Sequence, residues 1–361
     1  MSDTETAADA PAARQVIPGA GPTGGPEGGD GAVGAPGADP HAPAAGDASP
    51  GHDDTDRTAA RDRYRAAARD RDTLRLREDD PAAADDVPRY APEWLELREG
   101  ADAAARSAEL PRAALPPGGR DVLVVHDLGC GTGSMGRWLA PLLPGPQHWI
   151  LHDRDPYLLH FAAAGSPRTA ADGSRVTVET RRADVARLTP DAFAGATLVT
   201  ASALLDVLTR DEVDRLAAAC AEAACPALLT LTVAGRVELG PADPLDAEIE
   251  DAFNAHQRRT GLLGPDAVTA ACEAFDRHGA TVRVRPSPWR LGPGERRLTR
   301  AWLGGRVAAA VEQRPDLADR AEAYLARRLE ACDAGGLTAV VHHADLLAVP
   351  GATGPGVGDG T

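Results

Sequence analysis

Residues Asp121 to Met135 read D-V-L-V-V-H-D-L-G-C-G-T-G-S-M and give the clearest indication of the fold. Its first half is apolar and mostly β-branched, which is typical of a strand buried on both faces of a parallel sheet. Glycine then occupies alternate positions, and apolar residues with helical spacing follow to residue 143. The pattern predicts a strand at 121–128, a tight glycine turn and a helix at 134–143, with the turn open to a ligand.

Two classes of ligand fit this glycine turn. Gly131-x-Gly133-x-x-Gly136 matches the fingerprint of dinucleotide-binding proteins, which is a weak signal when it stands alone. Asp127 lies just before the first glycine, where its charge would repel a pyrophosphate and attract a cationic amino-acid group. The run D-L-G-C-G-T-G closely resembles motif I of class I S-adenosylmethionine (SAM) dependent methyltransferases. The resemblance implies that SAM is the cofactor and that its site contains Asp127, Gly129, Cys130, Gly131 and Gly133.

Strands and helices alternate along the rest of the chain, as in doubly wound α/β proteins. Further strands are predicted at 148–153, 175–181, 196–201, 226–233, 280–285 and 337–348. Helices are predicted at 92–110, 156–164, 211–224, 246–259 and 265–278, with a helical segment at 295–332. The expected fold is therefore a doubly wound, mostly parallel seven-stranded sheet. Its last strand, which re-enters the sheet, is similar to the class I methyltransferase topology.

Composition divides the chain of 361 residues into four parts. Residues 1–56 are rich in Ala, Gly, Pro and acids, so we expect an acidic disordered tail. Residues 57–120 are expected to form helices and a linker, and by analogy with methyltransferases these helices would cap the cofactor cleft. Residues 121–349 would form the SAM-binding methyltransferase domain, with helical insertions near 243–263 and 295–332, and residues 350–361 a flexible tail.

The charge of the chain argues against nucleic acid as a partner. The formal net charge is -16 and the pI is about 5.0, so an extended phosphate-binding surface is not expected. No apolar run reaches the length of a membrane span, and no signal peptide is recognisable. We therefore expect a cytoplasmic protein with a small-molecule substrate, no membrane association and no nucleic-acid partner. The oligomeric state stays open.

The ends of the later strands carry the other candidate cofactor contacts, because ligands of a doubly wound sheet bind at the carboxyl ends of its strands. Asp153 ends the second strand, and H-D-R-D-P resembles motif II, whose acid accepts hydrogen bonds from ribose hydroxyls. Asp155, directly before Pro156, is instead predicted to cap a helix. Asp184 resembles the acid that accepts from the adenine amino group, and Ser202 ends a strand that resembles motif IV.

No specialised catalytic signature is present, and the five cysteines show no spacing typical of a metal site. Many SAM enzymes need little more than alignment of the methyl group with a nucleophile, sometimes aided by a general base. Asp206 could be such a base or a structural acid. Histidine candidates are His152, His256 and the pair His342/His343, with His256 favoured because it lies in the first helical insertion. Trp289 and Trp302 could line the same pocket or pack in the core.

The sequence therefore predicts a SAM-dependent methyltransferase that acts on an oxygen or nitrogen nucleophile of a small molecule. One alternative is an NAD(P)-dependent oxidoreductase that uses the same glycines and Asp153. It would lack a Tyr-x-x-x-Lys pair, because the 38 basic residues are all arginine. The other alternative is a non-catalytic SAM-fold protein that regulates a partner through its N-terminal tail.

Overall fold

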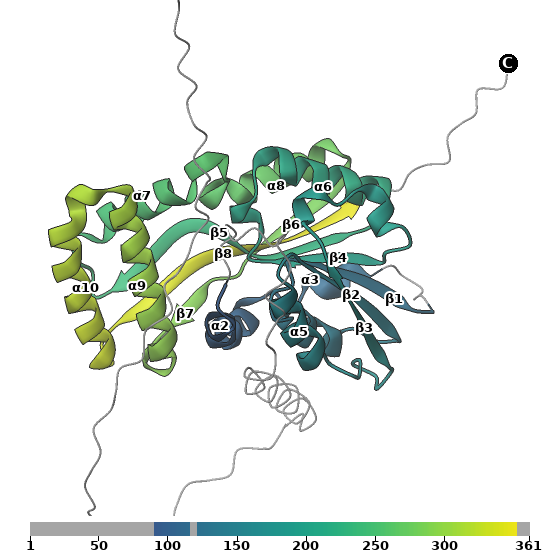
Figure 1. Cartoon of the computed structure of the whole chain (residues 1–361), viewed down its shortest axis with the longest axis horizontal. Helices are drawn as coiled ribbons and strands as arrows, with labels where there is room; N and C mark the ends of the chain where they lie inside the picture. Colours follow the sequence, from purple (N-terminus) through teal and green to yellow (C-terminus); the bar gives the residue numbers. More distant parts are fainter. Residues whose placement is uncertain (1–89, 116–120, 352–361) are drawn as a thin grey trace, which may run out of the picture.

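The structure, a computed structural model, describes residues 90–115 and 121–351. The acidic tail predicted at 1–56, the cap segment at 57–89 and nearly all of the tail at 350–361 lie outside the described residues. Within them, an 8-stranded mixed sheet has helices on both faces (Figure 1). None of the helices in these two ranges is long and apolar enough to cross a membrane.

The main path of the sheet has the strand order β3-β2-β1-β4-β5-β8-β6. The bounds are β1 Leu123–Leu128, β2 Gln147–Asp153, β3 Val176–Arg182, β4 Leu198–Ser202, β5 Ala227–Gly240, β6 Ala280–Pro286 and β8 Thr338–Pro350. Strands β1 to β5 pair in parallel, whereas β8 pairs antiparallel with β5 and β6. This confirms the predicted doubly wound sheet. Because the strand order reverses between β1 and β4, a crevice forms at their carboxyl ends.

Two features of the sheet differ from the sequence prediction. Strand β5 continues to Gly240 and pairs with β8 over most of its length, so the two strands form a long arm beyond the parallel part. A short additional strand, β7 at Trp289–Leu291, pairs with β8 on this arm. The predicted strand ends at 233 because Gly235, which has φ of +73°, reads as a break in a strand, whereas the structure continues β5 through irregular pairing at this point. Strand β7 is too short to show a period.

Helices on the two faces of the sheet bury separate apolar clusters. On one face lie α6 (Arg210–Glu222) and α8 (Ala267–Arg277), which pack against β4 and β5 (Figure 1). On the other lie α3 (Leu110–Ala114) against β5 and β8, α4 (Ser134–Leu139) against β4, and α5 (Pro156–Gly165) against β2 and β3. Helix α6 starts where the sequence predicts it, because Thr209 and Glu212 form a capping box.

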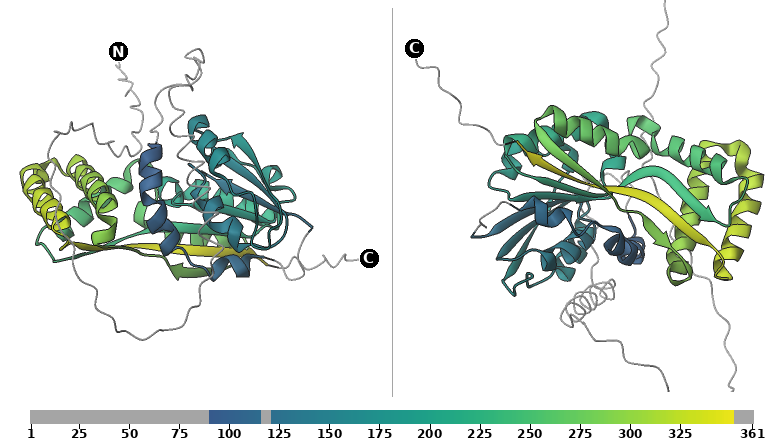
Figure 2. Two further views of the ribbon diagram at one scale, coloured as in Figure 1. Left: turned by 90° about the horizontal axis from the view of Figure 1, so that it is seen from below. Right: turned by 180° about the vertical axis from the view of Figure 1, so that it is seen from behind.

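The predicted helical insertions pack around the arm. They form α7 (Asp246–Gln257), α9 (Arg296–Gln313) and α10 (Ala318–Asp333), which share buried apolar side chains. Helix α2 (Pro92–Ala105) lies at the junction between the arm and the parallel part of the sheet, as all three views show (Figures 1 and 2). The arm and α2 therefore add walls to the crevice at the strand ends.

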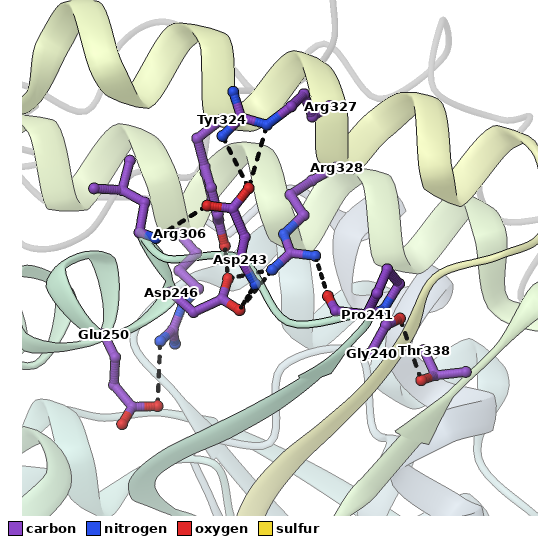
Figure 3. A network of polar contacts seen from close by, with 11 residues as sticks. Gly240, Pro241, Asp243, Asp246, Glu250, Arg306, Tyr324, Arg327, Arg328 and Thr338 are labelled. Carbon is purple, nitrogen blue, oxygen red and sulfur yellow. Dashed lines mark hydrogen bonds and ion pairs between the residues drawn. The ribbon is translucent and has the colours of Figure 1, made fainter.

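A polar network fastens α10 to the segment that leads into α7 (Figure 3). The Arg328 guanidinium donates to Asp246 at 2.6 Å, and the Tyr324 hydroxyl donates to the same carboxylate at 2.7 Å. Arg327 pairs with Asp243 at 2.8 Å. Arg328 is buried, and a buried charge needs hydrogen-bonded partners of opposite charge to be stable. The Asp246 carboxylate provides this compensation, so the network holds the helices of the arm in one arrangement.

Candidate cofactor and substrate site

A cavity of about 660 Å³ extends from the carboxyl ends of β1, β2 and β4 along the arm. This volume lies within the range of roughly 300–1,000 Å³ that is usual for small-molecule sites. We call its two parts the strand-end half and the arm half. The strand-end half is lined by Asp127, Gly129, Cys130, Gly131, Asp153, Asp184 and Ser202. The arm half is lined mainly by Trp94, Arg98, Phe253, Trp289, Trp302, Arg306 and His343.

The glycine turn between β1 and α4 adopts backbone conformations that L side chains rarely take. Gly129 and Gly131 have φ of +59° and +54°, and a Cβ on Gly131 would lie 3.2 Å from Leu95 of α2. Gly133, with φ of +84°, faces away from the cavity, and a Cβ there would lie 3.1 Å from the backbone of Ala162 in α5. The first two glycines thus keep the cavity wall free of side chains, whereas Gly133 allows close packing of the turn on a helix.

Asp127, one residue before the end of β1, is a buried carboxylate with an incomplete set of partners. Its Oδ1 accepts a hydrogen bond from the Thr200 hydroxyl at 2.8 Å, but its buried Oδ2 has no hydrogen-bond partner among the described residues. Burial raises the pKa of Asp127 to about 7, against the opposing effects of Thr200 and the Arg106 charge. An unsatisfied buried acceptor is destabilising, so this wall is complementary to a ligand that brings a cationic donor.

Asp153 ends β2 and is held by two backbone groups. The N–H of Gly131 donates to its Oδ2 and the N–H of Asp155 to its Oδ1, each at 2.9 Å. The carboxylate therefore ties the glycine turn to the start of α5, and burial raises its pKa. Asp155 accepts from the N–H of Tyr157 at 2.9 Å, which confirms its predicted role as a helix cap.

Asp184 and Ser202 reach the strand-end half from β3 and β4. Asp184 is exposed and accepts from the N–H of Ala186 at 3.1 Å. Ser202 accepts from Arg106 at 2.9 Å. Arg106 lies between α2 and α3 and was not among the sequence candidates, because nothing local distinguishes it from the many other arginines. It is buried, and its Nε and Nη1 have no hydrogen-bond partner within the described part of the chain.

The structure does not bring His152 or His256 to the cavity lining. His152 is buried within the sheet, where its ring stacks on His126 with centroids 5.2 Å apart, and burial lowers the pKa of both rings to about 4. His256 is buried on α7 and its Nε2 lies 3.1 Å from Glu312 of α9. Both histidines contact other protein groups, because β2 and α7 turn these positions into the interior.

Asp206 and His343 do line the cavity. Asp206 lies in the turn after β4, its Oδ1 has no hydrogen-bond partner in the described ranges, and burial raises its pKa. His343 lies on β8 against the ring of Trp289, at 5.3 Å between centroids. Burial lowers the pKa of His343 to about 4, so its imidazole is neutral at pH 7. His342 also lines the cavity, and its Nε2 lies 2.9 Å from Glu238. The structure therefore places Asp206 and both histidines of this pair where a bound substrate could meet them.

Helix α2 forms a fixed wall of the cavity. Glu99 on α2 pairs with Arg137 of α4 at 2.7 Å, and Asp102 accepts from the indole N–H of Trp289 at 2.9 Å. The buried carboxylate of Asp345 on β8 accepts from the N–H of Ser107, which follows α2, at 2.7 Å. Contacts to α4, β7 and β8 thus hold α2 over the cavity.

The described residues contain no candidate metal site. No group of three or more His, Cys, Asp or Glu side chains in residues 90–115 and 121–351 could hold a metal ion. The cysteines at 130, 220, 225, 272 and 332 are all free thiols. Cys130 lines the strand-end half beside the glycines. Burial raises the pKa of its thiol, so the side chain is an uncharged part of the cavity wall.

Comparisons with known proteins give structural likenesses only. No protein-family model matches the chain, and no curated protein matches its sequence. The cyclopropane synthase MmaA2 from Mycobacterium tuberculosis is 13% identical with a TM-score of 0.37, over 67% of this chain and 82% of that chain. A SAM-dependent methyltransferase from Geobacter sulfurreducens, in complex with S-adenosyl-L-homocysteine, is 14% identical with a TM-score of 0.38, over 72% of this chain and 99% of that chain.

Likenesses this distant do not bear on the reaction. The class of fold rests on the strand order, in which the antiparallel β8 lies between β5 and β6 of an otherwise parallel sheet. This is a Rossmann-like fold of the class I methyltransferase type, and it agrees with the topology that the sequence predicts.

Proposed function

We propose that this protein is a SAM-dependent methyltransferase that transfers a methyl group to an oxygen or nitrogen of a small molecule. The observation that carries the proposal is the carboxylate of Asp127, which keeps one buried oxygen without a hydrogen-bond partner in the described residues, beside an open glycine turn. The α-ammonium group of SAM would supply the missing cationic donor. Glycines at 129 and 131 leave the backbone accessible to the rest of the cofactor.

The remaining polar groups of the strand-end half support the same ligand. Each oxygen of Asp153 uses one acceptor site on the backbone and keeps another, so the carboxylate can also accept from two ribose hydroxyls. Asp184 lies where the adenine amino group would be expected, after β3. Cys130 and Ser202 are small side chains beside the turn. SAM supplies an electrophilic methyl group when bound, and the chain has to orient the acceptor and exclude water.

The arm half supports binding of the methyl acceptor. Its walls are largely aromatic, and Trp94 and Arg98 of α2 form part of them. Asp206 is our candidate for the general base, because its raised pKa makes this carboxylate a stronger proton acceptor than an exposed aspartate. Neutral His343 is the second candidate, and its role would be to accept a hydrogen bond from the nucleophile.

A dinucleotide fits the turn less well. Its pyrophosphate would lie near Asp127, where two negative groups would repel each other in a buried site. Gly136, the third glycine of the fingerprint, packs against Trp149, which is helix–sheet packing that either class of protein can use. A regulatory role through residues 1–56 concerns a segment outside the described residues.

Thermal unfolding with added ligands tests the proposal. SAM or S-adenosylhomocysteine at ~100-fold above Kd should stabilise the protein by ~2.7 kcal/mol, whereas NAD and NADP should not. Asp127→Asn is the control for the site and should remove most of the shift. A shift with NAD or NADP and none with SAM or S-adenosylhomocysteine would refute the proposal. Turnover is then checked by release of S-adenosylhomocysteine in the presence of candidate acceptors.

A further inference from the structure

Arg306 on α9 is a buried cation whose partners are incomplete. Its side chain is 5% exposed and lines the arm half of the cavity. The acidic group nearest to it in the described residues is Glu250 of α7, at 3.6 Å, which is too long for a hydrogen bond (Figure 3). Glu250 is itself engaged, because its Oε2 accepts from the backbone N–H of Val237 at 2.6 Å.

A guanidinium has five N–H donors, and none of those of Arg306 makes a hydrogen bond within residues 90–115 and 121–351. Burial lowers the pKa of Arg306, yet an arginine keeps its charge at any physiological pH. A buried charge without hydrogen-bonding partners is strongly destabilising, so the arm half is electrostatically incomplete. A ligand that carries a negatively charged hydrogen-bond acceptor would supply the missing partner of Arg306.

Two rings hold the guanidinium in place. Arg306 lies over Phe253 of α7 at 4.9 Å and over Trp302 of α9 at 5.6 Å. In the same half of the cavity, Arg98 lies over Trp289 at 5.0 Å. The faces of these rings are thus already used by cations of the protein. A quaternary ammonium or another cationic substrate would be repelled there, although the aromatic walls taken alone would suggest such a ligand.

The charge near Arg306 favours a monoanion. Glu250 reduces the positive potential at the guanidinium, and Arg98 is paired with Asp102 at 2.9 Å. A doubly charged phosphate would therefore meet too little positive charge. A carboxylate matches the planar donor face of an arginine and brings one negative charge. On the same wall, Asn254 and Gln257 of α7 each keep a buried carbonyl oxygen without a partner in the described chain, and these could accept from O–H or N–H groups of the ligand.

We propose that the methyl acceptor is a small organic carboxylate, whose carboxylate binds Arg306 in the arm half of the cavity. This inference rests on the proposed function, because it identifies the acceptor of the methyl group. Arg306 acts as an anchor that orients the substrate. The nucleophilic atom is another group of the same molecule, which faces the strand-end half.

The test uses the full-length protein saturated with S-adenosylhomocysteine and three probes that share a phenyl ring: benzoate, neutral benzamide and phenyl phosphate. Calorimetry should show benzoate binding at least ~10-fold more tightly than either of the other two. Arg306→Gln should weaken benzoate by at least ~10-fold and leave benzamide unchanged. Arg300→Gln is the matched control, because Arg300 lies on the same helix but is exposed and pairs with Asp333. It should leave all three affinities unchanged.

Glu250→Gln should change benzoate affinity in the direction opposite to Arg306→Gln. Loss of the competing carboxylate should tighten benzoate binding severalfold, whereas a purely structural role of Glu250 would weaken it. Equal binding of benzoate and benzamide to the wild type, or unchanged benzoate binding in Arg306→Gln, would overturn the inference. Preference for phenyl phosphate would overturn the assignment to carboxylates. Failure to bind S-adenosylhomocysteine at the outset would instead refute the proposed cofactor.

Discussion

Asp153→Asn separates two roles of one carboxylate, namely support of the glycine turn and binding of the cofactor ribose. In the wild type, both oxygens accept backbone hydrogen bonds, from the N–H groups of Gly131 and Asp155, each at 2.9 Å. Asparagine has only one acceptor oxygen, so its amide group would face one of these N–H donors. One buried hydrogen bond would then be lost and two donors would oppose each other.

The expected loss of stability follows from two opposing effects. A buried N–H left without an acceptor destabilises a protein by about 1–3 kcal/mol. Burial raises the pKa of Asp153, so the charged side chain is itself disfavoured, and the neutral amide recovers part of that free energy. We therefore expect a loss near the lower limit, about 1 kcal/mol, and a Tm lower by about 2–4 °C.

Cofactor affinity should fall further than stability. Each charge-assisted hydrogen bond to a ribose hydroxyl is worth about 1.5–3 kcal/mol, so losing one should weaken S-adenosylhomocysteine binding by about 10- to 100-fold. The assays are thermal unfolding without ligand and calorimetry with S-adenosylhomocysteine. Asp155→Asn is the matched control, because asparagine also caps helices well. Wild-type affinity in Asp153→Asn would refute the ribose role, and a greater loss in Asp155→Asn would assign that role to Asp155.

A glycine variant and a pH series further test whether the strand-end half binds the cofactor. Gly131→Val should abolish S-adenosylhomocysteine binding, because its side chain would enter the cavity wall at φ +54° with the Cβ 3.2 Å from Leu95. Gly145→Val, at φ +87° with open space around it, should destabilise the protein by a similar backbone effect but leave binding intact, and equal binding by both variants would contradict the assignment. S-adenosylhomocysteine affinity should rise roughly 5- to 10-fold from pH 6.0 to 7.5, because Asp127, with its pKa raised to about 7, must lose its proton to pair with the ammonium group. In Asp127→Asn this rise should disappear, and a persistent rise would place the titrating group elsewhere.

The features that could be predicted from the sequence are those that depend on neighbours along the chain. A β-branched run followed by alternate glycines predicts the strand, turn and helix around Gly131, because strand preference and positive φ are local properties. Asp155 before a proline predicts a helix cap for the same reason. The alternating order of strands and helices was sufficient to predict the doubly wound sheet, since neighbouring parallel strands are usually connected by crossover helices.

Which side chains reach the cavity could not be predicted, because this depends on the packing of distant segments. His256 and Arg306 lie on neighbouring helices of the arm, yet the first is buried with its Nε2 3.1 Å from Glu312 and the second lines the cavity. The sequence predicts that Asp153 lies at the end of a strand, but only the fold shows that its carboxylate is buried between Gly131 and the start of α5. Burial and charge compensation depend on residues far apart in the chain, so no local pattern could reveal a guanidinium without hydrogen-bonding partners.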